Sequence, residues 1–510
     1  MKTKNNLIYG FIALSLLTFN GCQESFLDVQ PEDRITSVTF WQSEDDVKLA
    51  LNGIYSVLRD RGVYGSGPTL DAMTPDAYQW AHWNGKEQQI GNGSTTPASD
   101  GLTMERWTMC YRIISRANYF LANIDKVELS DATKATYIGE VHFLRGIAYA
   151  LLAETYGGVP IINSVIGTVE AREVSRATPQ ETWDQAIADY DIVIEKLQVA
   201  APQTGRATKG AALGFKMRAY LYQNNYSEVL NVIEQIDALS KYSLFPSYEG
   251  LFQLANENNQ EVLFDIQYIG GELSQGNFFA WLALPQNSAN GASDPAPTQH
   301  IVDAYEMIDG STVDPNNPYE GRDPRLDFTI LRPGALFEGK LYPNEIKNHT
   351  GQRVGFGLRK NVGENIPITT ARMSPLNFIV LRYADVLLSK AEALIETNQN
   401  IDEAIALINR IRTERNDVKI TALPMGLSQA EAREELRHER RIEFFGEGIN
   451  WADIKRWNIG SDIYPAEVRG GNGSLIEIKF PTGYLEKDNL LPIPDNERSL
   501  NANLQQNPGW

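Results

Sequence analysis

The residue types that most often carry enzyme chemistry are present in this chain without the spacing that such chemistry needs. Its histidines are His82, His142, His300, His349 and His438. No two of them have the separation of a helical or loop metal pair, and neither G-x-S-x-G nor G-x-G-x-x-G occurs. Residues 334–341 match G-x-x-x-x-G-K, but Leu341 stands where a phosphate loop needs Ser or Thr. We therefore expect neither catalytic activity nor a cofactor.

Two acidic stretches allow other chemistry. Asp71 and Asp76, in "DAMTPDAYQW", could form the carboxylate pair of a glycosidase, although a chain with 65 acids contains such pairs by chance. Residues 309–327 are rich in oxygen ligands and could hold a structural calcium ion, but they lack the regular EF-hand spacing. A hydrogen-bonded polar turn is the interpretation that we favour for this second stretch.

Residues 438–457, "HERRIEFFGEGINWADIKRW", combine arginines with aromatic rings. Nucleic-acid binding is not expected, because acids offset these arginines and the whole chain has a formal net charge of −19. Arg440 and Arg441 are predicted to form ion pairs between packed helices, since a planar guanidinium meets a carboxylate in two places.

Two further stretches place aromatic rings beside polar side chains in sequence without helical periodicity. Such a combination suits a sugar, whose flat C–H faces lie on rings and whose hydroxyls need oriented polar partners. The first stretch offers Asp76, Tyr78, Trp80, Trp83 and Asn84. The second offers Asn277, Phe279, Trp281 and Gln286. The alternative is that these rings fill a core beneath long loops.

The elements that must position these residues are mostly helices. Ser43 and Thr178 are predicted N-caps, as is Asp131. Apolar periodicity predicts helices near residues 43–58, 102–127, 131–156, 179–199, 209–223, 226–239, 383–397, 401–415, 428–445 and 451–457. Residues 242–375 contain many turns and short strand-like pieces such as "EVLFDIQY".

A weak internal repeat indicates how the helices pair. "AALGFKMRAYLYQNNYSEVLNVIEQI" and "VLLSKAEALIETNQNIDEAIALINRI" each place an Ala-rich helix, a polar turn and a second apolar-striped helix in series. This is the pattern of a tetratricopeptide-type helical hairpin. Other helical hairpins share this pattern, so the two copies leave the type of hairpin open. We predict a mainly α fold with a loop-rich insertion that carries small β elements.

The N-terminus has the features of a lipoprotein signal. Lys2 and Lys4 precede a short apolar run that ends at Gly21, immediately before Cys22. The run is too short to span a bilayer, and no later stretch is long and apolar enough to do so. We expect the Cys22 sulfur to carry a lipid anchor; the alternative is a disulfide with Cys110.

Taken together, these stretches resemble the SusD/RagB-type outer-membrane nutrient-binding lipoproteins of the Bacteroidetes. The resemblance runs nearly from end to end. It rests on Cys22 followed by "FLDVQPED", and on "FWQSEDDVKLALNGIY", "VHFLRGIAYALLAETYGGVP", "GRATKGAALGFKMRAYLY", "GRDPRLDFTI", "RYADVLLSKAEALIE", "ERRIEFFGEGINWADIKRW" and "LLPIPDNERSLNANLQQNPGW". Asn450 departs from the family, which more often has Arg at this position.

The resemblance implies a non-catalytic surface protein that is lipid-anchored in the outer membrane and faces the cell exterior. It would capture an oligosaccharide or polysaccharide, or in some members a peptide, and deliver it to a SusC-like TonB-dependent transporter. The aromatic rings named above could then also face that transporter. A surface hydrolase or a purely structural protein is the less favoured alternative.

The resemblance also implies a helical core of tetratricopeptide-like hairpins, a loop-rich part that carries the binding face, and the following organisation of the chain. We expect a signal peptide over residues 1–21, a lipidated tether over 22–40, and a single SusD-like unit over 41–510, with its helical core at about 41–240 and 380–460, its loop-rich part at about 241–379 and an irregular tail at 460–510.

A Cys22→Ala variant is expected to move from the membrane fraction to the soluble fraction, because it loses the sulfur that would carry the lipid. Membrane association would be measured by fractionating a detergent-free lysate of cells that lack the transporter. A variant that stays with the membranes there would contradict the anchor.

Overall fold

A computed structural model describes residues 40–81, 85–270, 275–285, 291–337, 339–342, 346–348, 351–363 and 373–510. The longer helices are α2 (Glu44–Tyr55), α4 (Leu102–Asn123), α5 (Asp131–Tyr156), α7 (Pro179–Lys196), α8 (Lys209–Tyr222), α9 (Tyr226–Ala238), α15 (Tyr383–Glu396), α16 (Ile401–Thr413), α17 (Gln429–Phe444) and α18 (Asn450–Arg456). The mainly α fold class is confirmed.

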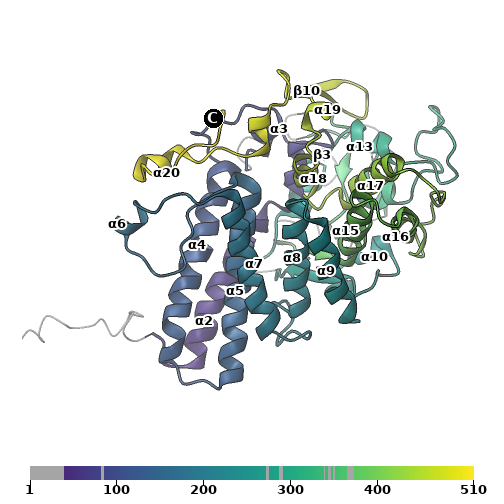
Figure 1. Ribbon diagram of the computed structural model, residues 1–510. Helices are drawn as coiled ribbons and strands as arrows, with labels where there is room; N and C mark the ends of the chain where they lie inside the picture. The colour runs from purple at the N-terminus through teal and green to yellow at the C-terminus, as the bar shows by residue number, and fades with distance from the viewer. Residues whose placement is uncertain are drawn as a thin grey trace, which may run out of the picture.

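The helices stack as a series of hairpins. Helix α5 packs against α4 and α7, α8 packs against α7 and α9, and α15 packs against α9, α16 and α17. Figure 1 shows this series from α4 to α16 as neighbouring helices. The two halves of the predicted repeat are the pairs α8–α9 and α15–α16, and α15 joins them by packing on α9. Tetratricopeptide-like hairpins therefore form the core, as the family resemblance implies.

Local sequence begins several of these helices. The side chains of Ser43, Thr178 and Ser428 each accept a hydrogen bond from the backbone amide of the third helical residue. The carboxylate of that residue in turn accepts one from the backbone amide of the cap residue. The predicted cap Asp131 is wrong by one residue. Ser130 caps α5, and Asp131 lies in the first turn, where the positive end of the helix dipole favours an acid.

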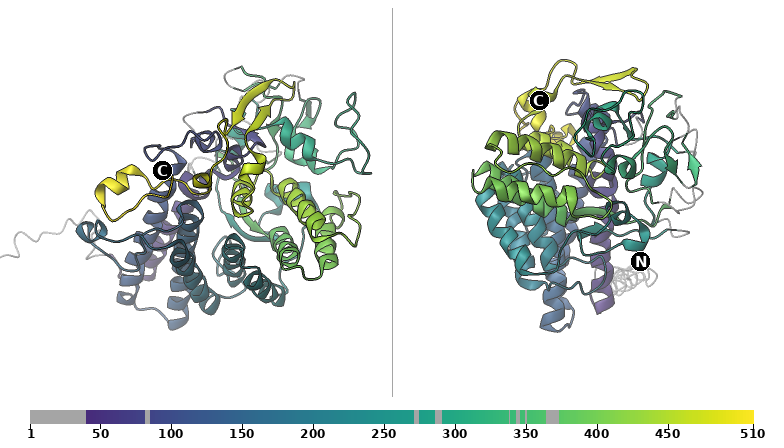
Figure 2. Two further views of the ribbon diagram at one scale, coloured as in Figure 1. Left: turned by 45° about the horizontal axis from the view of Figure 1, so that its top comes forward. Right: turned by 90° about the vertical axis from the view of Figure 1, so that its right-hand side faces the viewer.

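The described strands are short, and each pairs with one other strand to form a two-stranded sheet. The pairs are β1 (Ala77–Tyr78) with β3 (Ala296–Pro297), β2 (Val262–Ile266) with β8 (Phe378–Arg382), β4 (Ile330–Leu331) with β7 (Gly357–Leu358), β5 (Leu336–Phe337) with β6 (Lys340–Leu341), and β9 (Ala466–Arg469) with β10 (Leu475–Lys479). Most lie in the loop-rich part, which Figure 2 shows in teal and light green beside the helices.

Short helices complete the chain. They are α3 (Glu87–Gly91), α6 (Thr168–Ala171), α10 (Tyr248–Leu251), α11 (Phe279–Ala283), α13 (Gln299–Ala304), α14 (Arg325–Thr329), α19 (Gly460–Ile463) and α20 (Asp495–Leu500). The expected irregular tail thus contains the β9–β10 hairpin, the short helices α19 and α20, and a 3-10 helix at Glu486–Asn489. In the stretch 334–341, strands β5 and β6 pair with each other, whereas a phosphate loop leads from a strand into a helix.

Separate apolar clusters fill the two parts of the molecule. The largest lies among helices α2 to α9 and the β2–β8 pair, and a second fills the loop-rich part. Helix α17 belongs to the second cluster through Ile442, while its residues Ala432 and Leu436 pack with α15 and α16. One helix therefore faces both parts.

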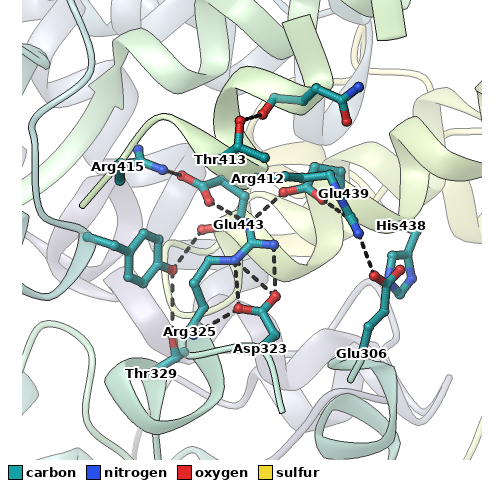
Figure 3. A network of polar contacts seen from close by, with 12 residues as sticks. Glu306, Asp323, Arg325, Thr329, Arg412, Thr413, Arg415, His438, Glu439 and Glu443 are labelled. Carbon is teal, nitrogen blue, oxygen red and sulfur yellow. Dashed lines mark hydrogen bonds and ion pairs between the residues drawn. The ribbon is translucent and has the colours of Figure 1, made fainter. Parts of the chain in front are cut away.

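Buried ion pairs cross the same boundary. The Glu443 carboxylate, on α17, accepts hydrogen bonds from Arg325 Nη1 at 2.8 Å and Arg382 Nη1 at 2.7 Å, and lies 3.0 Å from Arg415 Nη1. All four side chains are at most 1% exposed. Figure 3 shows how this cluster continues through Glu439 to other acids and arginines.

The charges in this cluster depend on one another. Burial alone would raise the pKa of Glu443, but Arg415, Arg382 and Arg325 overcome it and hold the pKa below its ordinary range. Its stabilising effect is therefore present above the ordinary pKa of a glutamate, and is lost as the pH falls through the lowered one.

Arg440 and Arg441 both form ion pairs, but only Arg440 forms them between packed helices, as predicted, because the partner of Arg441 lies in a turn. Arg440 Nη1 donates to Asp385 of α15 at 2.9 Å, and its Nε donates to Asp453 of α18 at 2.9 Å. Arg441 Nε donates to Asp76 at 2.9 Å, which connects α17 to the first aromatic stretch.

Glu443→Gln is expected to lower the free energy of unfolding by about 3–5 kcal/mol, because three buried guanidinium groups lose a charged partner. Chemical denaturation followed by circular dichroism would measure the change. The matched control is Glu434→Gln on the same helix, whose side chain is 74% exposed and pairs only with Arg437 among the described contacts. A Glu443→Gln variant that unfolds at the same denaturant concentration as this control would contradict the expected role of the cluster.

Candidate aromatic binding site

Strand pairing brings together the two aromatic stretches of the sequence. Strand β1 pairs with β3 in antiparallel register, with Ala77 opposite Pro297 and Tyr78 opposite Ala296. The Thr298 amide donates to the Asp76 carbonyl at 3.0 Å and extends the pairing by one residue. Because β3 follows α11, the first stretch is held beside the second.

Trp80 and Trp281 meet through the backbone of Ala292. The Ala292 amide donates to the Trp281 carbonyl at 2.9 Å. The Ala292 carbonyl accepts a hydrogen bond from Trp80 Nε1 at 2.8 Å. The hydrogen-bonding capacity of the Trp80 indole N–H is thus used inside the protein. The accessible part of this side chain therefore presents ring carbons to a ligand.

Tyr78, Trp80 and Trp281 are each half-buried. Tyr78 and Trp281 rest against the apolar cluster of the loop-rich part, so one side of each ring is supported by packed side chains. Burial, with the nearby carboxylates of Glu477 and Asp294, raises the pKa of Tyr78 to about 12. Its hydroxyl is therefore neutral at physiological pH and can both donate and accept a hydrogen bond.

Three other predicted site residues lie inside the framework. Asp76 is 3% exposed, and although burial alone would raise its pKa, Arg441 and His300 hold that pKa well below its usual range. Asn277 is buried; its side-chain amide donates to the Leu376 carbonyl, and its Oδ1 accepts from the Phe279 amide at 3.0 Å.

The Phe279 ring is 4% exposed and packs edge-on against Phe378, with centroids 5.2 Å apart. The structure therefore corrects the expected role of Asp76, Asn277 and Phe279. They support the aromatic surface, and we leave them out of the proposed ligand contacts.

Other predicted residues lie outside the described part of the chain. They are Cys22, Trp83, Asn84 and Gln286. Cys110, the alternative partner of Cys22, is a free thiol buried in α4.

Two features near the site were not predicted from the sequence. Asp294 is buried and accepts a hydrogen bond from the Trp80 backbone amide at 3.1 Å. A cavity of about 540 Å³ is lined by Asp76 and by residues of α17 and α18. The only sequence signal for Asp294 was an acid before a proline in a turn-rich segment, a pattern that many loops share.

The aspartates of residues 309–327 have partners within the chain. Asp309 Oδ1 accepts from the Ser311 amide at 2.9 Å, and Asp314 Oδ1 accepts from the Asn316 amide at 2.9 Å. Asp323 and Asp327 pair with arginines. These contacts are those of hydrogen-bonded polar turns. Within the described residues, no three His, Cys, Asp or Glu side chains are grouped as a metal site.

Asp71 and Asp76 differ sharply in environment. Burial, with a smaller effect of Asp76, raises the pKa of Asp71 to about 8, although its Oδ2 accepts a hydrogen bond from the Gly446 amide at 2.7 Å. Asp71 is 1% exposed. A carboxyl group buried in this way is protonated at neutral pH, and it fixes the turn between α17 and α18.

This raised pKa predicts how stability varies with pH. The neutral form of Asp71 is favoured by the folded state, so its contribution is complete below the ordinary pKa of an aspartate and is lost as the pH rises through about 8. Asp71→Asn keeps an acceptor for Gly446 and cannot ionise.

We expect Asp71→Asn to gain stability relative to the wild type as the pH rises from 5 to 9, which melting temperatures of both proteins would measure. The difference between their free energies of unfolding should increase by at most about 1.4 kcal/mol per pH unit. A difference that is constant over this range would show that Asp71 ionises normally.

Within the described residues, no helix combines the length and apolar character needed to cross a membrane. Residues 25–221 match a family model described as "Starch-binding associating with outer membrane", and residues 260–510 match the model of the SusD family.

Relatives match over most of their length. "SusD-like protein P2" of Formosa agariphila is 25% identical, over 98% of this chain and 99% of the relative. The solved structure of a SusD-like protein from Bacteroides fragilis is 26% identical with a TM-score of 0.80, and covers 94% of this chain and 100% of its own.

A second structure from the same organism, named a SusD-like carbohydrate binding protein, is 27% identical with a TM-score of 0.81, and covers 92% of this chain and 100% of its own. With matching models in both halves and relatives of the same architecture along its length, this chain belongs to the SusD family.

Proposed function

We propose that this protein is a non-catalytic surface lipoprotein that captures oligosaccharides on the aromatic surface formed by Tyr78, Trp80 and Trp281. The observation that carries the proposal is the meeting of two distant aromatic stretches at the β1–β3 pair. A SusD-like relative at 27% identity is named a carbohydrate binding protein, which supports the same ligand class.

The chemistry of this surface suits a sugar. A pyranose ring presents C–H groups on its faces and hydroxyls around its edge. Supported aromatic rings can pack on those C–H groups, while the neutral Tyr78 hydroxyl can exchange hydrogen bonds with the edge. The Trp80 N–H already has a partner, so its indole contributes apolar contact.

Delivery to a partner and location complete the proposal. We place the protein at the outer face of the outer membrane, anchored through Cys22, with a SusC-like TonB-dependent transporter as the recipient of the sugar. The family model's description of outer-membrane association supports this location. The same proposal takes residues 41–510 as one unit behind a lipidated tether.

Trp281→Ala and Trp80→Ala are each expected to weaken oligosaccharide binding about thirtyfold, because truncating a central aromatic contact costs roughly 2 kcal/mol. A carbohydrate array would identify the ligand, and isothermal titration with that ligand would measure the affinities. Melting curves of both variants should stay close to that of the wild type.

The matched control is Trp451→Phe. Trp451 is 4% exposed and stacks on Phe480, with ring centroids 6.3 Å apart. This change should lower the melting temperature and leave the affinity intact. Full affinity in both surface variants would contradict the proposed site. A wild-type protein that binds short peptides and no oligosaccharide would favour the peptide-binding alternative.

A further inference from the structure

Asp294 lies between the two tryptophans of the proposed site. Asp294 is 0% exposed, and its Oδ1 accepts a hydrogen bond from the Trp80 backbone amide at 3.1 Å. Burying a carboxylate costs free energy unless its oxygens accept hydrogen bonds. The Asp294 carboxylate therefore favours conformations that keep the Trp80 amide within reach.

The backbone around Asp294 is fixed on its other side by α11. The Asp294 amide donates to the Leu282 carbonyl at 2.7 Å, and the Ser293 amide donates to the Leu284 carbonyl at 2.9 Å. Together with the hydrogen bond from Ala292 to Trp281, these contacts attach residues 292–294 to the helix that carries Trp281. Two of these three residues contact Trp80, Asp294 through its carboxylate and Ala292 through its carbonyl.

Trp80 is consequently held at two points. Its backbone amide is bound by Asp294 and its indole N–H by Ala292, so both its main chain and its ring orientation are set by one short segment. A ring that is ordered before the ligand arrives loses less conformational freedom on binding.

We propose that Asp294 is a positioning residue, which acts through Trp80 to hold the Trp80 and Trp281 rings in a fixed relation for the ligand. This inference rests on the proposed function for its effect on affinity. The effect on the Trp80 ring itself does not depend on any ligand.

The test compares Asp294→Ala with Asp294→Asn. Alanine removes the acceptor, whereas asparagine keeps an oxygen at the same position. We expect Asp294→Ala to alter the near-ultraviolet circular dichroism of tryptophan and to weaken oligosaccharide binding about fivefold to tenfold, the loss expected for one net hydrogen bond. Asp294→Asn should restore most of both signals.

A background that lacks the Trp80 ring makes the assignment specific. In a Trp80→Ala protein, adding Asp294→Ala should change the tryptophan dichroism no further, because the positioned ring is already absent. The control for loss of a buried carboxylate is Asp265→Ala. Asp265 is also buried, and its oxygens accept from Gln267 at 2.5 Å and Asn377 at 3.2 Å. This control should retain the wild-type dichroism and affinity.

The proposal is overturned if Asp294→Ala leaves the tryptophan dichroism unchanged, or if Asp294→Asn loses as much signal as Asp294→Ala. It is also overturned if Asp294→Ala has its full effect in the Trp80→Ala background. Should the wild type bind no oligosaccharide, the proposed function fails, and the dichroism measurements still decide whether Asp294 positions Trp80.

Discussion

The contact of one buried carboxylate with three buried guanidinium groups governs how the two parts of this molecule fit together. Glu443 receives Arg325 from the loop-rich part, Arg382 from the end of β8 and Arg415 from the segment after α16. Each charge is out of contact with water, so a change in docking that separates one pair leaves another charge without compensation. We infer that the main role of the cluster is to select a single arrangement of the loops on the helices. Apolar side chains packed in its place would give comparable stability without that selection.

Helix α17 transmits this arrangement to the aromatic surface. One turn holds Glu443 in the cluster, while Arg441 on the same helix holds Asp76 at the start of the first aromatic stretch. Strand β1 follows Asp76 directly, and its pairing with β3 brings in the second stretch. The binding loops are therefore attached to a rigid helix by charge-assisted hydrogen bonds, which is how a loop surface can keep a defined shape.

The helical part could be predicted from the sequence because its signals are local. Apolar spacing predicts the pairs α8–α9 and α15–α16 to within a few residues, and the composition of α17 predicts that Arg440 and Arg441 form ion pairs. For the aromatic binding site, the sequence predicts the two aromatic stretches but not that they lie side by side. Strands β1 and β3 have two residues each, too few for an alternating pattern, and their pairing joins distant parts of the chain.

Residue type alone also does not separate surface rings from core rings. Phe279 and Trp281 are two positions apart in α11, yet Phe279 packs in the core and Trp281 reaches the surface. Which of them is accessible depends on Phe378 and on the segment at Ala292, neither of which is local in sequence. The role of Asp294 also could not be predicted from local sequence, because it depends on the hydrogen bond from the distant residue Trp80.

A crystal structure of the protein with a bound oligosaccharide would test most directly whether the framework organised by α17 presents the binding surface. We predict sugar rings packed on Trp80 and Trp281, with the Glu443 cluster and the Arg441–Asp76 pair unchanged from the unliganded protein. Sugar bound elsewhere on the molecule, or bound at this surface only after Arg441 and Asp76 have separated, would contradict it.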